Sequence, residues 1–195
     1  MNTRPFPRPR LIVLLLIVIL SATGLWLGYR WFEGRYLRAF SDQTALFAGD
    51  ALSLPASLAG PGRIRVVHFW DTACPCNVGN QQHLIELVER FARGGGVDFY
   101  SVRKPGTQGR LPKTLSAITP LEALPGADRI TSSPAIAIWD RQGALAYFGP
   151  YSEGLVCSSQ NSFVEPVIQA LLADRPVNTT HTMAVGCYCP WATPD

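Results

Sequence analysis

Cysteine offers the most chemistry in this sequence, and four of the five cysteines form two closely spaced pairs. Cys74 and Cys76 flank a single proline, Cys187 and Cys189 flank a single tyrosine, and Cys157 stands alone between the pairs. Thiols at such spacing can exchange disulfides, and their thiolates can hold a soft metal ion such as Cu(I), or zinc. The sequence therefore predicts a redox or metal centre built from cysteine.

The partner of each thiol is left open by the spacing. A disulfide between Cys74 and Cys76 would close a smaller ring than one with two intervening residues, and strain would raise its reduction potential. The alternatives are that the two thiols bridge to other cysteines or bind a metal. Neither pair has the two-residue spacing of zinc ribbons.

The first pair lies between a predicted strand and a predicted helix. Residues 64–70 are typical of a buried strand, and apolar residues at i, i+3, i+4 and i+7 from Leu84 mark a helix that stops at glycines 94–96. Cys74 thus precedes the start of a helix, where unpaired N–H groups and the helix dipole favour the thiolate. We expect Cys74 to be the reactive thiol and Cys76 to resolve the mixed disulfide that it forms.

The remaining elements complete an α/β pattern. A strand at 97–102 closes a βαβ unit, whose two strands should be parallel. A connector with a short helix near 116–124 should follow, and then a hairpin of strands 134–139 and 144–148. A capping box at Ser162 starts the last helix. The expected fold class is α/β with a mixed central sheet.

Two segments resemble the thioredoxin superfamily. Residues 69–74, Phe-Trp-Asp-Thr-Ala-Cys, resemble the entrance to the thioredoxin active site, and residues 131–134, Thr-Ser-Ser-Pro, resemble its cis-proline segment. The resemblance covers about residues 51–173 and points to the membrane-tethered periplasmic thiol–disulfide oxidoreductases. It implies a thioredoxin-like fold in which Pro134 shapes the groove beside Cys74. One departure is the single residue between the cysteines, where the family has two.

A narrower resemblance rests on Gly-Pro-Tyr-Ser at 149–152 and Gly-Cys-Tyr-Cys-Pro-Trp at 186–191. Both are similar to segments of an uncharacterised bacterial family of thioredoxin-like membrane proteins, which supplies no known activity.

Three histidines receive different interpretations. His68 stands where thioredoxins place a buried carboxylate that accepts protons, so it either shuttles a proton for the cysteine pair or is a hydrogen-bonded core residue. His83 is expected on the surface of its helix, and His181 in a solvated loop.

The resemblance also predicts that the cysteines converge. The cis-proline end of one hairpin strand lies beside the reactive cysteine in this fold, and the antiparallel second strand returns to the same edge, near Cys157. The stretch 173–186 is long enough to bring back Cys187 and Cys189. We expect two disulfides with one free cysteine, a relay through Cys157 or the tail pair, or a metal site. The candidate metal ligands are Cys74, Cys76, Cys157, Cys187 and Cys189.

The N-terminal region predicts a signal-anchor. Every residue from Leu11 to Leu20 is aliphatic, and about 17 uncharged residues span roughly 26 Å, enough for a bilayer core. Residues 21–24 lack the small-x-small site of a cleaved signal peptide. The expected organisation is a basic cytoplasmic tail at 1–10, a transmembrane anchor at 11–28, a stalk at 29–50, the thioredoxin-like domain at 51–173 and a cysteine-containing tail at 174–195.

Arginines flank this segment on both sides, so charge alone does not orient it. Cysteine usage favours an oxidising compartment, which gives a single-pass protein of the bacterial inner membrane with its soluble domain in the periplasm.

Three functions fit these features. The first is thiol–disulfide exchange with protein thiols or disulfides, which requires no cofactor. The second is thiolate binding or delivery of copper or zinc, and the third is a non-enzymatic scaffold stapled by disulfides. A net charge of +3 without a basic stripe argues against nucleic acid as a partner.

Overall fold

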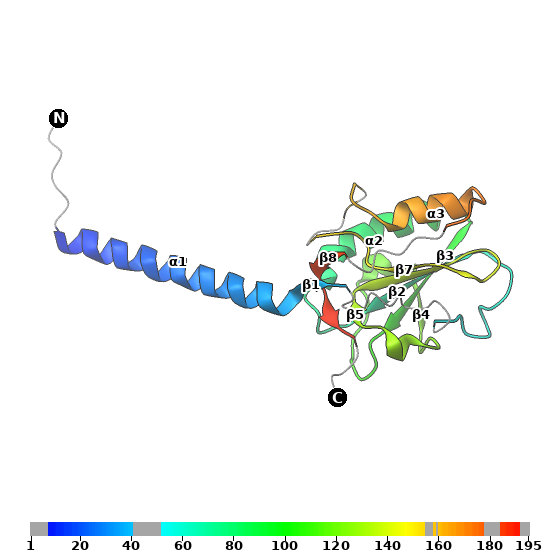
Figure 1. The fold of residues 1–195 in the computed structure, drawn as a ribbon, viewed down its shortest axis with the longest axis horizontal. Coiled ribbons are helices and arrows are strands. Elements are labelled where there is room, and N and C mark those ends of the chain that lie inside the picture. The colour runs from blue at the N-terminus through cyan, green and yellow to red at the C-terminus, as the bar shows by residue number, and fades with distance from the viewer. Residues whose placement is uncertain (1–7, 41–51, 155–157, 159, 178–183, 192–195) are drawn as a thin grey trace. The chain divides into compact units, whose positions relative to one another are not determined.

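The structure is a computed structural model that describes residues 8–40, 52–154, 158, 160–177 and 184–191. The chain divides into two units, Met1–Tyr36 and Leu37–Asp195 (Figure 1).

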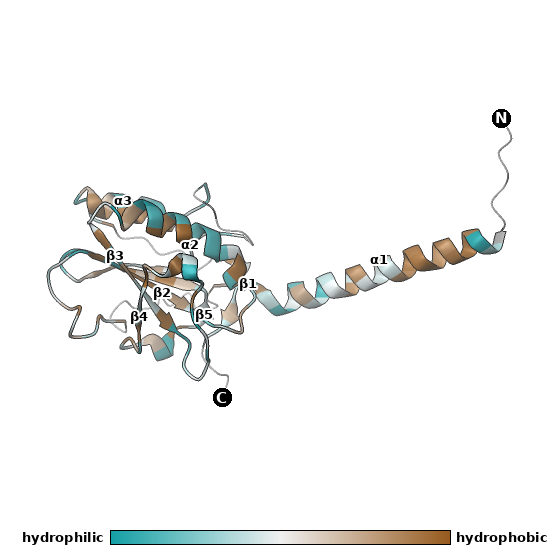
Figure 2. Cartoon of the chain, turned by 180° about the vertical axis from the view of Figure 1, so that it is seen from behind, coloured by the Kyte–Doolittle hydropathy of each residue, from teal (hydrophilic) through white to brown (hydrophobic). Residues whose placement is uncertain are grey.

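The first unit is a single apolar helix. Helix α1 spans Arg8–Tyr36, and its residues Pro9–Tyr36 are long and apolar enough to cross a membrane. The side chains of Leu11–Leu20 are all more than half exposed and form the most hydrophobic stretch in Figure 2. The helix continues past residue 28, so the predicted stalk begins as helix.

The second unit is built on a five-stranded mixed sheet. Its strand order is β4-β3-β2-β6-β7, with β2 parallel to β3 and antiparallel to β6. β3 is also parallel to β4, and β6 and β7 form the antiparallel hairpin. The strands are β2 (Ile64–Trp70), β3 (Val97–Arg103), β4 (Thr119–Leu121), β6 (Ala135–Trp139) and β7 (Leu145–Gly149). The predicted βαβ unit, hairpin and mixed α/β sheet are confirmed, in agreement with the thioredoxin-like fold that the resemblance implies.

Two helices cover one face of this sheet (Figure 1). Helices α2 (Asn77–Phe91) and α3 (Val164–Leu172) pack over Ile64 and Val66 of β2. The alternate residues of β2, Val67 and Phe69, enter a second core on the opposite face. Successive side chains of a strand point to opposite faces, so β2 is buried along its whole length.

The predicted short helix at 116–124 is wrong. A 3₁₀ turn, Lys113–Leu115, is followed by strand β4, in which Thr119–Leu121 pair with Tyr100–Val102 of β3. Pro120 lies in the middle of this segment, and proline lacks the N–H that a helix interior needs. An edge strand tolerates the same residue. A second 3₁₀ turn follows at Ala127–Arg129.

Two small ladders return the C-terminal tail to the sheet. Strand β1 (Leu37–Ala39), inside the predicted stalk, pairs with β8 (Val185–Cys187). Strand β5 (Ser132–Ser133) pairs with β9 (Cys189–Pro190). The peptide bond between Ser133 and Pro134 is cis, as the thioredoxin resemblance predicts.

Candidate functional site

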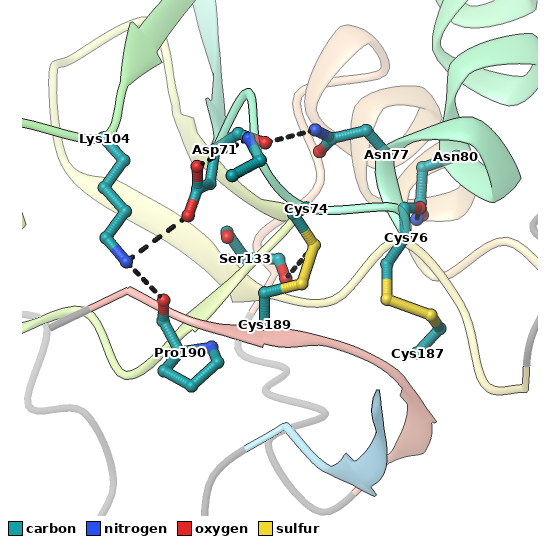
Figure 3. The surroundings of a disulfide bond; sticks show 11 residues. Asp71, Cys74, Cys76, Asn77, Asn80, Lys104, Ser133, Cys187, Cys189 and Pro190 are labelled. Atoms are coloured by element: carbon teal, nitrogen blue, oxygen red, sulfur yellow. Dashed lines mark hydrogen bonds and ion pairs between the residues drawn. A yellow bond between two sulfur atoms is a disulfide. The ribbon is translucent and has the colours of Figure 1, made fainter. Parts of the chain in front are cut away.

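Two disulfides join the start of helix α2 to the tail (Figure 3). Cys74 is bonded to Cys189, with their Cα atoms 5.9 Å apart, and Cys76 is bonded to Cys187, at 5.4 Å. Among the alternatives that the sequence left open, the structure has the bridges to other cysteines. The two Cys-x-Cys segments run in opposite directions, so each sulfur of one segment meets a sulfur of the other.

The four sulfur-bearing residues are packed away from solvent. None of the four is more than 7% exposed. The Sγ atoms of Cys74, Cys76 and Cys189 all lie within 4.8 Å of one another. A thiolate released at Cys76 would therefore lie next to the bond between Cys74 and Cys189.

Backbone hydrogen bonds hold the tail independently of the disulfides. Cys187 is opposite Leu37 in the β1–β8 ladder, and Cys189 is opposite Ser133 in the β5–β9 ladder. The N–H of Trp191 donates to the carbonyl of Thr131 at 3.0 Å.

Aromatic side chains of the tail also anchor it. Trp191 lies edge-on against Phe69 of β2, with ring centroids 5.8 Å apart. Tyr188 is edge-on to Phe40 at 5.3 Å, and its hydroxyl donates to the carbonyl of Ser152 at 3.3 Å. Reduction of both bridges would thus leave many contacts between the tail and the sheet.

Lys104 connects the tail to the loop before Cys74 (Figure 3). Its Nζ donates to the carbonyl of Pro190 at 2.8 Å and lies 3.3 Å from a carboxylate oxygen of Asp71. The other carboxylate oxygen accepts the N–H of Ala73 at 2.9 Å. The ion pair is nearly buried, with 16% and 9% of the two side chains exposed, so it should be stronger than a surface pair.

Lys104 and Asp71 were not predicted as site residues. A signal was available, because Asp71 follows the last residue of β2 and Lys104 follows the last residue of β3. The carboxyl ends of adjacent parallel strands commonly carry functional side chains.

His68 is buried within strand β2. Its Nδ1 is 2.7 Å from the hydroxyl of Tyr151, and burial lowers the pKa of the imidazole to about 3, against a smaller opposing effect of the backbone at Ala135. A group with this pKa stays neutral at physiological pH and is a weak base. The geometry therefore matches the hydrogen-bonded core interpretation; the proton-shuttle role stays a prediction.

The expected surface position of His83 is wrong. The side chain is fully buried, and its Nε2 is 2.9 Å from the hydroxyl of Ser162, which also accepts the N–H groups of Val164 and Glu165 at the start of α3. His83 precedes Leu87 by one helical turn, so it lies on the apolar face of α2. Burial lowers its pKa.

Two sequence candidates, Cys157 and His181, lie outside the described residues. The described part of the chain just before Cys157 does contact the tail, because the N–H of Gly154 donates to the carbonyl of Val185 at 2.8 Å.

Comparison with protein families gives one match. The family model described as Domain of unknown function (DUF6436) matches residues 43–191. A comparison with curated proteins gives no match.

Several solved structures are similar to the chain at low identity. An uncharacterized conserved protein from Geobacillus kaustophilus is 18% identical with a TM-score of 0.49, covering 82% of this chain and 88% of that one. A hypothetical protein from Sinorhizobium meliloti 1021 is 16% identical with a TM-score of 0.47, covering 82% and 96%. A thiol-disulfide isomerase from Corynebacterium glutamicum is 14% identical with a TM-score of 0.37, covering 74% and 95%.

Proposed function

This chain belongs to the family described as Domain of unknown function (DUF6436), and we propose that it acts in thiol–disulfide exchange. The exchange uses the two disulfides between the start of α2 and the tail. The observation that carries the proposal is the cluster of three sulfurs within 4.8 Å of one another, drawn from two different bridges.

The first step is attack from outside. A thiolate of a partner protein attacks Cys187, forms a mixed disulfide with it, and releases Cys76 as a thiolate. A second partner thiol then attacks the mixed disulfide, so the partner leaves with a new disulfide and Cys187 remains as a thiol. The partner is oxidised by two electrons and the Cys76–Cys187 bridge is reduced by two.

The second step moves the remaining bridge. The Cys76 thiolate attacks Cys189, a new bond forms between them, and Cys74 leaves as a thiolate. Cys74 lies just before α2, where the helix dipole stabilises the negative charge of a leaving sulfur. This exchange moves the disulfide of Cys189 from Cys74 to Cys76. Cys74 then becomes the free thiol that can react with the next partner.

The tail acts as the resident partner of this site. Cys189 is joined to Cys74 by a disulfide and to Ser133, beside the cis Pro134, by backbone pairing. A protein that replaces the tail must therefore present its cysteine in an extended segment at this position.

The oxidised cysteines also support a location outside the cytosol. We place the chain in the bacterial inner membrane through Pro9–Tyr36, with the cysteine-bearing unit in the periplasm.

A redox titration of the full chain in detergent tests the exchange. Glutathione buffers set the potential, and mass spectrometry after alkylation reports the state of each thiol. We expect two reversible two-electron steps in the wild type and one in Cys74→Ser, which keeps the Cys76–Cys187 bridge but cannot form the bridge to Cys189. The same titration in Cys157→Ser shows whether the fifth cysteine takes part. If the bridges resist all exchange in the folded protein, the exchange proposal is wrong and the disulfides have a structural role only.

Thiolate metal binding is the second candidate, favoured by the same sulfur cluster. After reduction, Cys74, Cys76, Cys187 and Cys189 would supply four thiolates, a set suited to zinc or Cu(I). Zinc binding by the reduced chain should then slow its reoxidation, and Cys187→Ser should weaken binding. Reduced chain that loses zinc to a mild chelator at once would exclude this candidate.

A further inference from the structure

A hollow near the disulfide site is lined by Lys104 but by no cysteine. It has a volume of about 830 Å³ and lies between the end of β3 and the segment that leads into β4. The buried side chains of Trp70, Leu115 and Ile118 line it. Its size falls in the range of specific ligand sites.

The rest of its lining is strongly basic. Arg103, Lys104, Arg110 and Lys113 line this hollow, against one acidic residue, Glu122. Arg110 and Lys113 are exposed, and their side chains make no ion pair or hydrogen bond with the described residues. The hollow therefore combines apolar side chains with unneutralised positive charge.

Lys104 connects the hollow to the tail. This lysine lines the hollow and also donates to the carbonyl of Pro190, the residue after Cys189. A smaller hollow of about 260 Å³ shares Trp70, Arg110 and Leu115 with it and extends to Asn77 at the start of α2. The buried Oδ1 of Asn77 accepts no hydrogen bond from the described residues. A polypeptide leaving the position of Pro190 can therefore pass Lys104 and enter the hollow.

We infer that this hollow binds an acidic segment of the partner polypeptide, with carboxylates near Arg110 and Lys113 and apolar side chains on Trp70 and Leu115. The substrate class is then proteins whose reactive cysteine lies close in sequence to glutamates or aspartates mixed with apolar residues. The cysteine part of this statement rests on the proposed exchange, whereas recognition of the acidic segment does not.

A polypeptide fits better than a small anion. Two hollows that share a wall, one of them lined by Lys104, which contacts Pro190 of β9, suit an extended chain. A phosphate-sized group would leave the apolar side chains of the lining without a contact. Complementary charge also raises the rate at which an acidic partner finds the site.

Binding of a cysteine-free peptide tests the inference. The full chain in phosphatidylcholine nanodiscs is titrated with a short labelled peptide of alternating leucine and glutamate, followed by fluorescence anisotropy at low salt. We expect the glutamate peptide to bind at least about tenfold tighter than its glutamine counterpart, and binding to weaken as salt rises. The double variant Arg110→Glu/Lys113→Glu should lose about tenfold or more in affinity.

A matched control reverses two charges elsewhere. Arg93→Glu/Arg129→Glu makes the same change in net charge at exposed positions outside the hollow and should bind as the wild type does. Equal binding by Arg110→Glu/Lys113→Glu and the wild type would overturn the inference. So would binding only to phosphatidylglycerol vesicles, since a lipid surface would then be the ligand.

The two proposals can fail separately. Peptide binding without any exchange of the disulfides would remove the exchange proposal alone. Exchange with a small dithiol, but no preference for the glutamate peptide, would remove this inference alone.

Discussion

One face of the central sheet is covered by two regular helices, and the other is covered by segments from distant parts of the chain. On the first face, α2 and α3 pack through apolar stripes. On the second, the tail aromatics Tyr188 and Trp191 share one core with Phe40, Leu52 and Leu54. Among the described segments of the second face, the tail alone is attached by disulfides. The helical face meets the bridges only at the start of α2, so we expect it to depend mainly on packing, whereas the other face should respond to redox state.

Removal of both bridges should have the largest effect. The bridges enclose almost the same stretch, with separations of 115 and 111 residues, so one of them already restricts most of the unfolded chain. Replacing all four cysteines by serine should lower the free energy of unfolding by about 6 kcal/mol, and Cys76→Ser/Cys187→Ser alone by about 2 kcal/mol. Urea unfolding of the full chain in detergent measures both. Equal, additive losses for each bridge would contradict this expectation.

A cavity on the helical face should have the next largest effect. Leu87 is fully buried on α2, and Leu87→Ala should lower the free energy of unfolding by about 3 kcal/mol in both redox states.

Trp191→Ala on the opposite face should behave differently. It should leave residues 184–191 protected in oxidised protein and release them after reduction. Hydrogen exchange in the two redox states measures this protection. If reduced Leu87→Ala also loses protection of residues 184–191, the two faces do not differ as expected.

Acid should destabilise the molecule through His68. Its pKa is about 3 in the folded protein and about 6.5 in the unfolded chain, so the unfolded state binds more protons between these values. The stability contributed by neutral His68 is complete above pH 6.5 and is lost as the pH falls towards 3, with about 2 kcal/mol lost at pH 5.

Substitution of this histidine gives the measurement. His68→Gln should flatten the dependence of unfolding free energy on pH between 7 and 5. Tyr151→Phe removes the hydroxyl partner but not the burial, so it should keep the wild-type slope. An unchanged slope in His68→Gln would show that other groups cause the pH dependence.

Loss of the Lys104 contact should have the smallest effect. Lys104→Met removes the hydrogen bond to Pro190 and leaves Asp71 without its cation, which should cost about 1 to 2 kcal/mol. In reduced protein, exchange of the Trp191 amide, whose N–H donates to Thr131, should become roughly tenfold faster. Lys113→Met, which changes an exposed lysine without a described partner, serves as the control. Identical exchange rates in the two variants would mean that Lys104 does not retain the tail.

The same contrast between faces explains what could be predicted from the sequence. The buried strand, the helix that follows Cys76 and the hairpin leave local periodic patterns, and all three are confirmed. The cis bond before Pro134 followed from a motif. The short helix near 116–124 was wrong because pairing with β3 decided the conformation of a proline-containing segment.

The disulfide partners could not be predicted in the same way. They depend on the path of the tail, and chain length shows only that Cys187 and Cys189 can return. Register decides the rest, since pairing of Cys189 with Ser133 brings its sulfur to Cys74. Two-residue ladders of this kind leave no periodic signal. The surface prediction for His83 failed for a related reason, because a polar residue on an apolar helix face became acceptable once Ser162 was its partner.

The two bridges also give the molecule a mechanical property. Tension applied to the two ends of the chain passes through the sulfur atoms, and the 115-residue loop between Cys74 and Cys189 bears no load. At about 3.6 Å per residue, this loop hides roughly 400 Å of extension until the bridges are cut. In an optical trap, each reduced molecule would lengthen by a fixed step, so the stretched length of a single chain would report its redox state.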